Sequence, residues 1–148
     1  MWDSKRHCCL SMTSQKLDFS SLCNALARLA EGYQRYQSDI SDIQIRDGLI
    51  QRYEFTYEIS HKILKRHIEM TSANLEILDA MPFADLIRTG NELSLLKSDW
   101  TAWKIFREMR AKTSHTYDED IALTVVQIIP LFIQEIQFLV LQLEIRHA

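Results

Sequence analysis

The chain has 148 residues, 47% hydrophobic and 25% charged, which is the composition of one ordinary globular domain. Its formal net charge of −3 argues against a protein that binds nucleic acid through a broad basic face, so any RNA contact must be local. Three glycines and two prolines exclude glycine-rich phosphate loops and disfavour a fold built on tight hairpins. Three cysteines imply no disulfide framework and favour a reducing, cytoplasmic location.

Residues 1–16 are expected to form a flexible N-terminal tail, and residues 17–148 a single helical bundle domain. The tail carries a cysteine pair and scattered charges but lacks the apolar central stretch of a signal peptide. From Phe19 the apolar residues recur at alternating spacings of three and four, which keeps one face of a helix toward a partner. This pattern predicts a first helix with the apolar residues Phe19, Leu22, Leu26, Leu29, Tyr33 and Tyr36.

A second, longer helix is predicted from about Asp47 to Thr71, with apolar residues on two adjacent stripes. One stripe contains Leu49, Tyr53, Tyr57, Leu64 and Ile68, and the other contains Phe55, Ile59 and Ile63. Pro82 then suits the first turn of a short third helix that runs to about Leu95, with Gly90 weakening its middle.

A fourth helix should begin at Ser98 or Asp99, because either side chain can cap the amides that follow. It carries Trp100, Trp103, Phe106 and Met109 and ends near Lys112, where a polar break follows.

The last helix should start at Tyr117 and run to about Arg146, since Thr116 and Glu119 have the spacing of a capping box. Although it is long enough to cross a membrane, several glutamines interrupt it, and we expect a buried soluble helix. Its two apolar stripes are Ile121, Val125, Ile128, Phe132 and Leu139, and Ala122, Ile129, Ile133, Ile136, Val140 and Leu143. Two stripes suggest that one contacts its own chain and the other a second subunit, as in a homodimer.

Three chemically active side chains are expected to gather where the fourth helix meets the last. Arg110 shares a stripe with Trp103 and Phe106, so its guanidinium points toward the apolar side and needs a carboxylate, a carbonyl or a phosphate as partner. His115 follows in the polar break, and Tyr117 begins the next helix. A fixed cation, an imidazole, a phenol and the free amides of a helix N-terminus together predict a phosphate site.

At these residues the sequence resembles a known family. Residues 110–119, Arg-Ala-Lys-Thr-Ser-His-Thr-Tyr-Asp-Glu, resemble the signature of HEPN domains, specifically the nucleotidyltransferase substrate-binding proteins. The resemblance extends to residues 99–103 and to residues 53–58 with Lys62, and it covers about Leu17 to Arg146.

The resemblance implies an all-α fold: an antiparallel up-and-down bundle of four to five helices that forms a homodimer. It also implies a partner, a minimal nucleotidyltransferase. Several members are toxins that cleave RNA without a metal or cofactor, and the nucleotidyltransferase is the antitoxin, which attaches AMP to the motif tyrosine. On this chain the catalytic roles fall to Arg110 and His115, and the AMP acceptor is Tyr117.

Two positions depart from the family pattern. Ala111 stands where the family commonly has Asn or another polar residue, which bears on cleavage more than on binding. His61 stands where an aromatic residue is expected, and its spacing to His67 is not that of zinc ligands, so both are interpreted as surface or partly buried histidines.

Three functions therefore remain open. The first is a HEPN-type endoribonuclease silenced by AMPylation, and the second is a non-catalytic subunit that presents a nucleotide or substrate to the nucleotidyltransferase. The third is a dimeric interaction bundle, in which Arg110 would pair with an internal carboxylate such as Glu54 or Glu58.

Overall fold

The structure, a computed structural model, describes residues 17–148, and the tail expected over residues 1–16 lies outside them. The described residues form six α-helices and one 3₁₀ turn, with no strand among them, which confirms the all-α fold but exceeds the four to five helices expected. The elements are α2 (Ser20–Ser38), α3 (Ile43–Thr71), α4 (Leu75–Asp79), α5 (Phe83–Glu92), α6 (Trp100–Lys112), η2 (Thr113–His115) and α7 (Glu119–Arg146).

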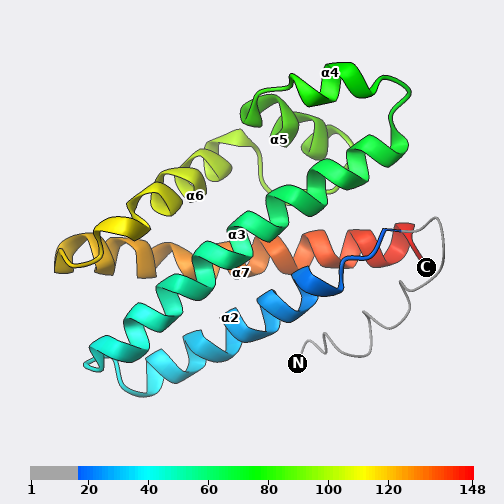
Figure 1. Cartoon of the computed structure of the whole chain (residues 1–148). Helices are drawn as coiled ribbons and strands as arrows, with labels where there is room; N and C mark the ends of the chain where they lie inside the picture. Colours follow the sequence, from blue (N-terminus) through cyan, green and yellow to red (C-terminus); the bar gives the residue numbers. More distant parts are fainter. Residues whose placement is uncertain (1–16) are drawn as a thin grey trace.

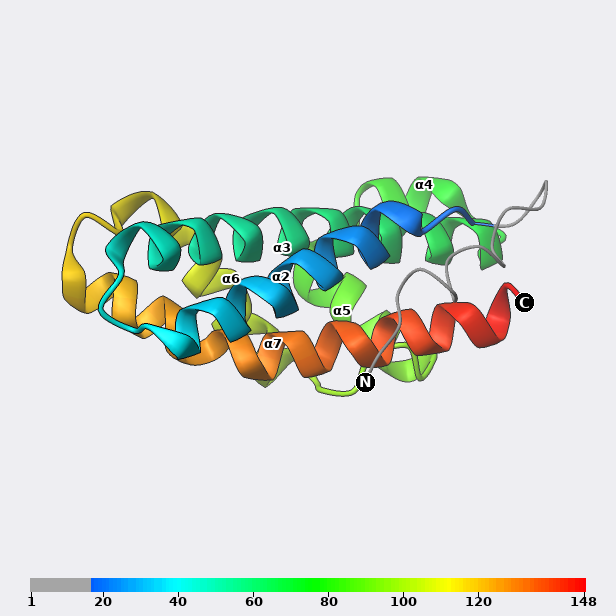
Figure 2. The ribbon, with the colours of Figure 1, turned by 90° about the horizontal axis from the view of Figure 1, so that it is seen from below.

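The helices run up and down along one long axis (Figures 1 and 2). α2 and α3 form one antiparallel pair, and α6 and α7 form another. Figure 2 shows the junction between α6 and α7 at one end of the molecule, whereas α4 and the C-terminus lie at the other. The predicted active junction is therefore at an exposed end of the bundle.

Side-chain caps explain where several helices begin. α3 starts at Ile43, earlier than expected, because the Asp42 carboxylate accepts a hydrogen bond from the Ile45 amide at 3.1 Å. Asn74 caps α4 through the Ile77 amide at 3.4 Å, and this short helix was not predicted. At α6, Asp99 rather than Ser98 is the capping residue.

The start of the last helix corrects the sequence prediction. α7 begins at Glu119 instead of Tyr117, and its cap is Asp118, whose carboxylate accepts from the amides of Asp120 at 3.0 Å and Ile121 at 3.3 Å. Thr116 does not cap it, since its hydroxyl donates to the Thr113 carbonyl at 3.4 Å. A carboxylate next to the helix is the better cap because it also interacts with the positive end of the helix dipole.

Gly90 does not interrupt α5, which continues through it to Glu92. The glycine is buried, and a Cβ atom there would lie 3.1 Å from Cδ1 of Leu96 and 3.2 Å from Cδ1 of Leu64. The missing side chain thus lets α5 pack closely against α3, which compensates for the low helix propensity of glycine.

The core lies between α2, α3, α6 and α7, and α7 crosses its centre. Both apolar stripes of α7 are covered largely by this chain's own helices: all six residues of the second stripe are buried, as are Val125, Phe132 and Leu139 of the first. The inference that one stripe is reserved for a second subunit is therefore wrong. The same packing accounts for the apolar character of α7, which is long and apolar enough to span a membrane by length and composition.

Aromatic rings fill the middle of this core. Phe132 of α7 lies 4.9 Å from Tyr53, 5.2 Å from Phe106 and 6.1 Å from Trp103, measured between ring centroids, and each pair packs edge to face. The Tyr53 hydroxyl donates a hydrogen bond of 2.6 Å to the Phe106 carbonyl, which joins α3 to α6. Burial of this phenol raises its pKa well above the ordinary value.

Cys23 in α2 is buried. The cysteines of the expected tail lie outside the described residues.

Candidate functional site

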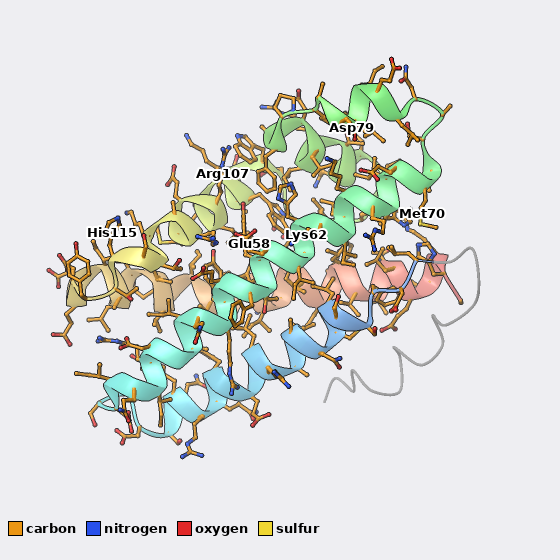
Figure 3. The ribbon with its side chains drawn as sticks, in the orientation of Figure 1. Glu58, Lys62, Met70, Asp79, Arg107 and His115 are labelled. Carbon is orange, nitrogen blue, oxygen red and sulfur yellow. The ribbon has the colours of Figure 1, made fainter. Side chains whose placement is uncertain are left out.

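The junction between α6 and α7 holds the three residues predicted from the motif. Arg110 is in the last turn of α6, His115 ends η2, and Tyr117 lies between η2 and the start of α7. Figure 3 shows His115 at the tip of this junction, away from the centre of the bundle. A short 3₁₀ turn joins the helices because the break contains small polar residues that bond their own backbone.

Arg110 makes an ion pair with α3. Its Nε donates a hydrogen bond of 2.8 Å to Oε1 of Glu58. Its Nη2 lies 2.7 Å from the same oxygen and 3.5 Å from Oε1 of Glu54. Of the three partners left open for Arg110, the structure shows a carboxylate, and this is the pairing with Glu54 and Glu58 that the third function, a dimeric interaction bundle, predicts. The side chain is nevertheless 29% exposed, so the pair is open to water on one side.

The guanidinium retains one unoccupied nitrogen. Within residues 17–148 the hydrogen bonds and ion pairs of Arg110 involve Nε and Nη2, and none involves Nη1. Because a guanidinium has five N–H donors, Nη1 can contact a phosphate oxygen while the other two nitrogens stay on Glu58. In this arrangement Glu58 orients the guanidinium and leaves Nη1 open to a phosphate oxygen.

Two further interactions hold the junction on α3. The Thr113 hydroxyl lies 2.8 Å from the Arg110 carbonyl and 3.2 Å from Oε2 of Glu54, so it connects η2 to both helices. Nη1 of the buried Arg46 lies 3.4 Å from Oε1 of Glu119, at the first turn of α7. Neither Thr113 nor Arg46 was singled out as a site residue in the sequence. The Thr113–Glu54 and Arg46–Glu119 contacts each join residues more than fifty positions apart.

His115 and Tyr117 are adjacent and accessible. Their ring centroids are 6.0 Å apart with an interplanar angle of 75°, and the Tyr117 side chain is 87% exposed. His115 is exposed as well. An imidazole that reaches solvent can accept a proton from a substrate hydroxyl, and a phenol this exposed can be reached by a modifying enzyme.

The junction is an open surface rather than an enclosed pocket. Two cavities found in residues 17–148 lie elsewhere: one of about 610 Å³ lies between α2 and α3, and one of about 250 Å³ lies between α6 and α7. No group of three or more His, Cys, Asp or Glu residues in the described part of the chain is placed to hold a metal ion. An open surface suits a long substrate or a protein partner better than a small molecule.

The two histidines of α3 differ in burial from one another. His61 is half-buried, with its ring 4.6 Å from that of Phe83, in agreement with the sequence interpretation. His67 is only 3% exposed, so its assignment as a surface or partly buried residue is wrong. Its Nδ1 lies 2.8 Å from Nε2 of His147, and burial, with the neighbouring His147, lowers its pKa to about 4. Its position three residues after Leu64, on the buried stripe, could have shown this.

Comparison with known proteins identifies the family. Residues 17–145 match the model of the family described as "Nucleotidyltransferase substrate binding protein like". The chain is 38% identical over 100 residues to a Haemophilus influenzae protein named "Probable ribonuclease HepT", a match that covers 68% of each chain. A solved Haemophilus influenzae structure, described as revealing the fold of a substrate binding domain of a nucleotidyltransferase, superimposes with a TM-score of 0.79 at 31% identity, covering 84% of this chain and 98% of that one. The chain therefore belongs to the nucleotidyltransferase substrate-binding family, the HEPN-like family that its Arg-x4-His-x-Tyr motif resembles.

Proposed function

We propose that the protein is a metal-independent endoribonuclease that works with a minimal nucleotidyltransferase and is silenced when that enzyme attaches AMP to Tyr117. The observation that carries this proposal is the exposed His115–Tyr117 ring pair at the same helix junction as Arg110, whose Nη1 makes no hydrogen bond or ion pair within residues 17–148. The name of the Haemophilus influenzae ribonuclease relative and the family description support the same combination of RNA and nucleotidyltransferase.

In the proposed reaction the 2′-hydroxyl of RNA attacks the adjacent phosphorus. His115 takes the proton of this hydroxyl, a bond forms from the 2′-oxygen to phosphorus, and the bond from phosphorus to the 5′-oxygen breaks. The leaving oxygen takes a proton back from the His115 imidazolium, which leaves a 2′,3′-cyclic phosphate and a 5′-hydroxyl. Nη1 of Arg110 stabilises the negative charge that builds up on the phosphate oxygens.

The test is cleavage of single-stranded RNA in the presence of a metal chelator. The wild-type protein should cut, and His115→Ala should lower the rate by about a hundredfold to ten-thousandfold, the usual contribution of a general base. Ser114→Ala is the matched control, because this exposed neighbour makes only a 3.5 Å hydrogen bond to the Ala111 carbonyl. RNA left intact by the wild-type protein, or cut equally by the His115 variant, would refute the proposed catalysis.

Silencing by AMP follows from the same geometry. The Tyr117 phenolate attacks the α-phosphorus of ATP held by the nucleotidyltransferase, a bond to AMP forms, and pyrophosphate leaves. The attached phosphodiester and adenosine would lie beside the His115 ring, 6.0 Å from the phenol ring, and block substrate phosphate there. Incubation with the nucleotidyltransferase and ATP should add the mass of AMP to the wild type and none to Tyr117→Phe, and it should abolish cleavage only where the mass is added.

A second candidate is a non-catalytic subunit that binds a substrate for the nucleotidyltransferase. The Glu58–Arg110 ion pair favours it, because a carboxylate competes with phosphate for the guanidinium. Ala111 favours it too, since alanine offers no side-chain hydrogen bond. In that case the two proteins co-purify while this chain alone leaves RNA intact.

Homodimerisation is also part of the proposal, and it rests on the family resemblance alone. Two apolar residues are the first positions to test for a dimer interface. Ile105 of α6 is 41% exposed and Leu131 of the neighbouring part of α7 is 56% exposed. Light scattering of the wild type and of Leu131→Glu should show a dimer that becomes a monomer. An unchanged mass would place the dimer interface elsewhere.

A further inference from the structure

Beside the Arg110–Glu58 pair, cationic and aromatic side chains meet where α3, α5 and α6 converge. The guanidinium carbon of Arg107 lies 5.6 Å from the centre of the Phe83 ring, and the His61 ring lies 4.6 Å from the same ring. Lys62 and Lys65 accompany His61 on α3. We call these five residues, His61, Lys62, Lys65, Phe83 and Arg107, the Phe83 cluster.

The cluster is locally positive although the whole chain is acidic. Among residues 17–148, no carboxylate lies within ion-pair distance of Lys62, Lys65 or Arg107. Burial lowers the pKa of His61, as do the charges of Lys65, Arg107 and Lys62. Glu58, which raises that pKa, is already bound to Arg110. Three cations without carboxylate partners among the described residues therefore lie near the His61 ring.

The cluster also offers a surface for stacking. Arg107 is exposed, and its guanidinium carbon lies over the Phe83 ring. Nucleic acid bases stack on guanidinium planes as they do on aromatic rings, so an exposed guanidinium can receive a base. Phe83 is itself held in place by Trp100, whose ring is 5.8 Å away and edge to face. Phe83 and Trp100 both pack against the hydrophobic core, which holds the Phe83 ring in position.

Its position continues the candidate active site. Arg107 precedes Arg110 by three residues on α6, and His61 follows Glu58 by three residues on α3, so each step is nearly one helical turn of about 5.4 Å. Figure 3 shows Glu58, Lys62 and Arg107 together between α3 and α6, with His115 farther along the same side.

We propose that the Phe83 cluster is a substrate subsite that binds the nucleotide next to the scissile phosphate of single-stranded RNA. Its base stacks on Arg107 over Phe83, and its phosphates contact Lys62 and Lys65. This inference rests on the proposed ribonuclease function. It adds the residues that would bind the RNA independently of its base sequence. A local cluster of this kind resolves the conflict between an acidic chain and an RNA substrate.

The test measures RNA binding on a His115→Ala background, in which the RNA stays intact. A short fluorescein-labelled single-stranded RNA is titrated by anisotropy at several salt concentrations, against single variants and Lys62→Gln/Lys65→Gln. Arg107→Gln should weaken binding by about fivefold to a hundredfold, as removal of one stacked base does. Arg107→Lys should keep the salt dependence yet bind more weakly than wild type, because lysine keeps the charge but not the plane.

The double variant of Lys62 and Lys65 measures the contribution of charge to RNA binding separately from that of stacking. Lys62→Gln/Lys65→Gln should reduce the slope of log affinity against log salt by about 1.4, or about 0.7 for each phosphate that is no longer neutralised. Arg35→Gln is the matched control, because Arg35 is an exposed cation without an ion pair in the described residues and lies on α2. Equal losses of affinity in the control and the cluster variants would overturn the proposal, as would unchanged binding in the cluster variants.

These results separate the subsite from the ribonuclease proposal. If the wild type and Arg107→Gln cut RNA at equal rates at low RNA concentration, the subsite is refuted and the proposed catalysis is unaffected. Protein that binds RNA through the cluster but never cuts it refutes catalysis and supports the subsite. Variants that lose the nucleotidyltransferase in co-purification while keeping RNA affinity show that the cluster is a protein docking surface, and they overturn the proposal.

Discussion

Replacing Arg110 by glutamine separates a catalytic arginine from a structural one, because the two roles predict different sizes of effect. The ion pair is partly hydrated, with the Arg110 side chain 29% and the Glu58 side chain 43% exposed. A pair of this kind contributes about 1 kcal/mol to stability, since water screens the attraction and solvates the carboxylate left behind. Removal of one hydrogen bond to a developing oxyanion instead costs about 2.7–4 kcal/mol, or about a hundredfold to a thousandfold in rate.

We therefore expect Arg110→Gln to lose about 1 kcal/mol in the free energy of unfolding and more than about a hundredfold in RNA cleavage rate. Urea denaturation measures the first quantity, and single-turnover cleavage in a metal chelator measures the second. Glu58→Gln is the matched variant, because it removes the closer of the two carboxylates that pair with Arg110 but keeps the arginine. It should lose a similar amount of stability and retain or increase cleavage, since the competing negative charge is gone.

The reasoning fails if the two variants behave alike. Arg110→Gln that cuts RNA at the wild-type rate would show that the guanidinium serves only the packing of α6 on α3. Glu58→Gln that loses activity as completely as Arg110→Gln would show that the carboxylate fixes a geometry without which Nη1 cannot reach the substrate.

Three further predictions concern stability and can be measured by denaturation. Tyr53→Phe removes the buried 2.6 Å hydrogen bond to the α6 carbonyl and should cost about 1–2 kcal/mol, so an unchanged urea midpoint would contradict the bond. His67 has a native pKa of about 4 against about 6.5 when unfolded, so between these pH values the unfolded state binds more protons. The free energy of unfolding should therefore fall on acidification through this range, by on the order of 2 kcal/mol. His67→Gln should flatten this dependence of stability on pH, and an equally steep dependence in the variant would assign it to another group. Ser94 follows α5 with φ 61°, a left-handed conformation that glycine adopts without strain, so Ser94→Gly should stabilise the protein by about 0.5 kcal/mol, whereas a lower thermal midpoint would refute the strain.

Local signals in the sequence predicted much of the candidate site. The Arg-x4-His-x-Tyr spacing placed Arg110, His115 and Tyr117 at one helix junction, where the structure has them. The position of Arg110 on the apolar side left a carboxylate, a carbonyl or a phosphate open as its partner, and the structure shows the carboxylate of Glu58. The Phe83 cluster was not predicted. His61, Phe83 and Arg107 come from three helices, and no short-range spacing relates them.

The sequence alone determined that this protein is helical, and where its long helices lie, because apolar periodicity and capping side chains act over a few residues. Only the tertiary structure decided what each helix face contacts. Most residues of both α7 stripes proved to be buried in the chain's own core, and Nη1 of Arg110 proved to make no hydrogen bond or ion pair within residues 17–148. Such facts depend on how helices cross and how far apart they sit, and those distances are set by side chains distant in the sequence.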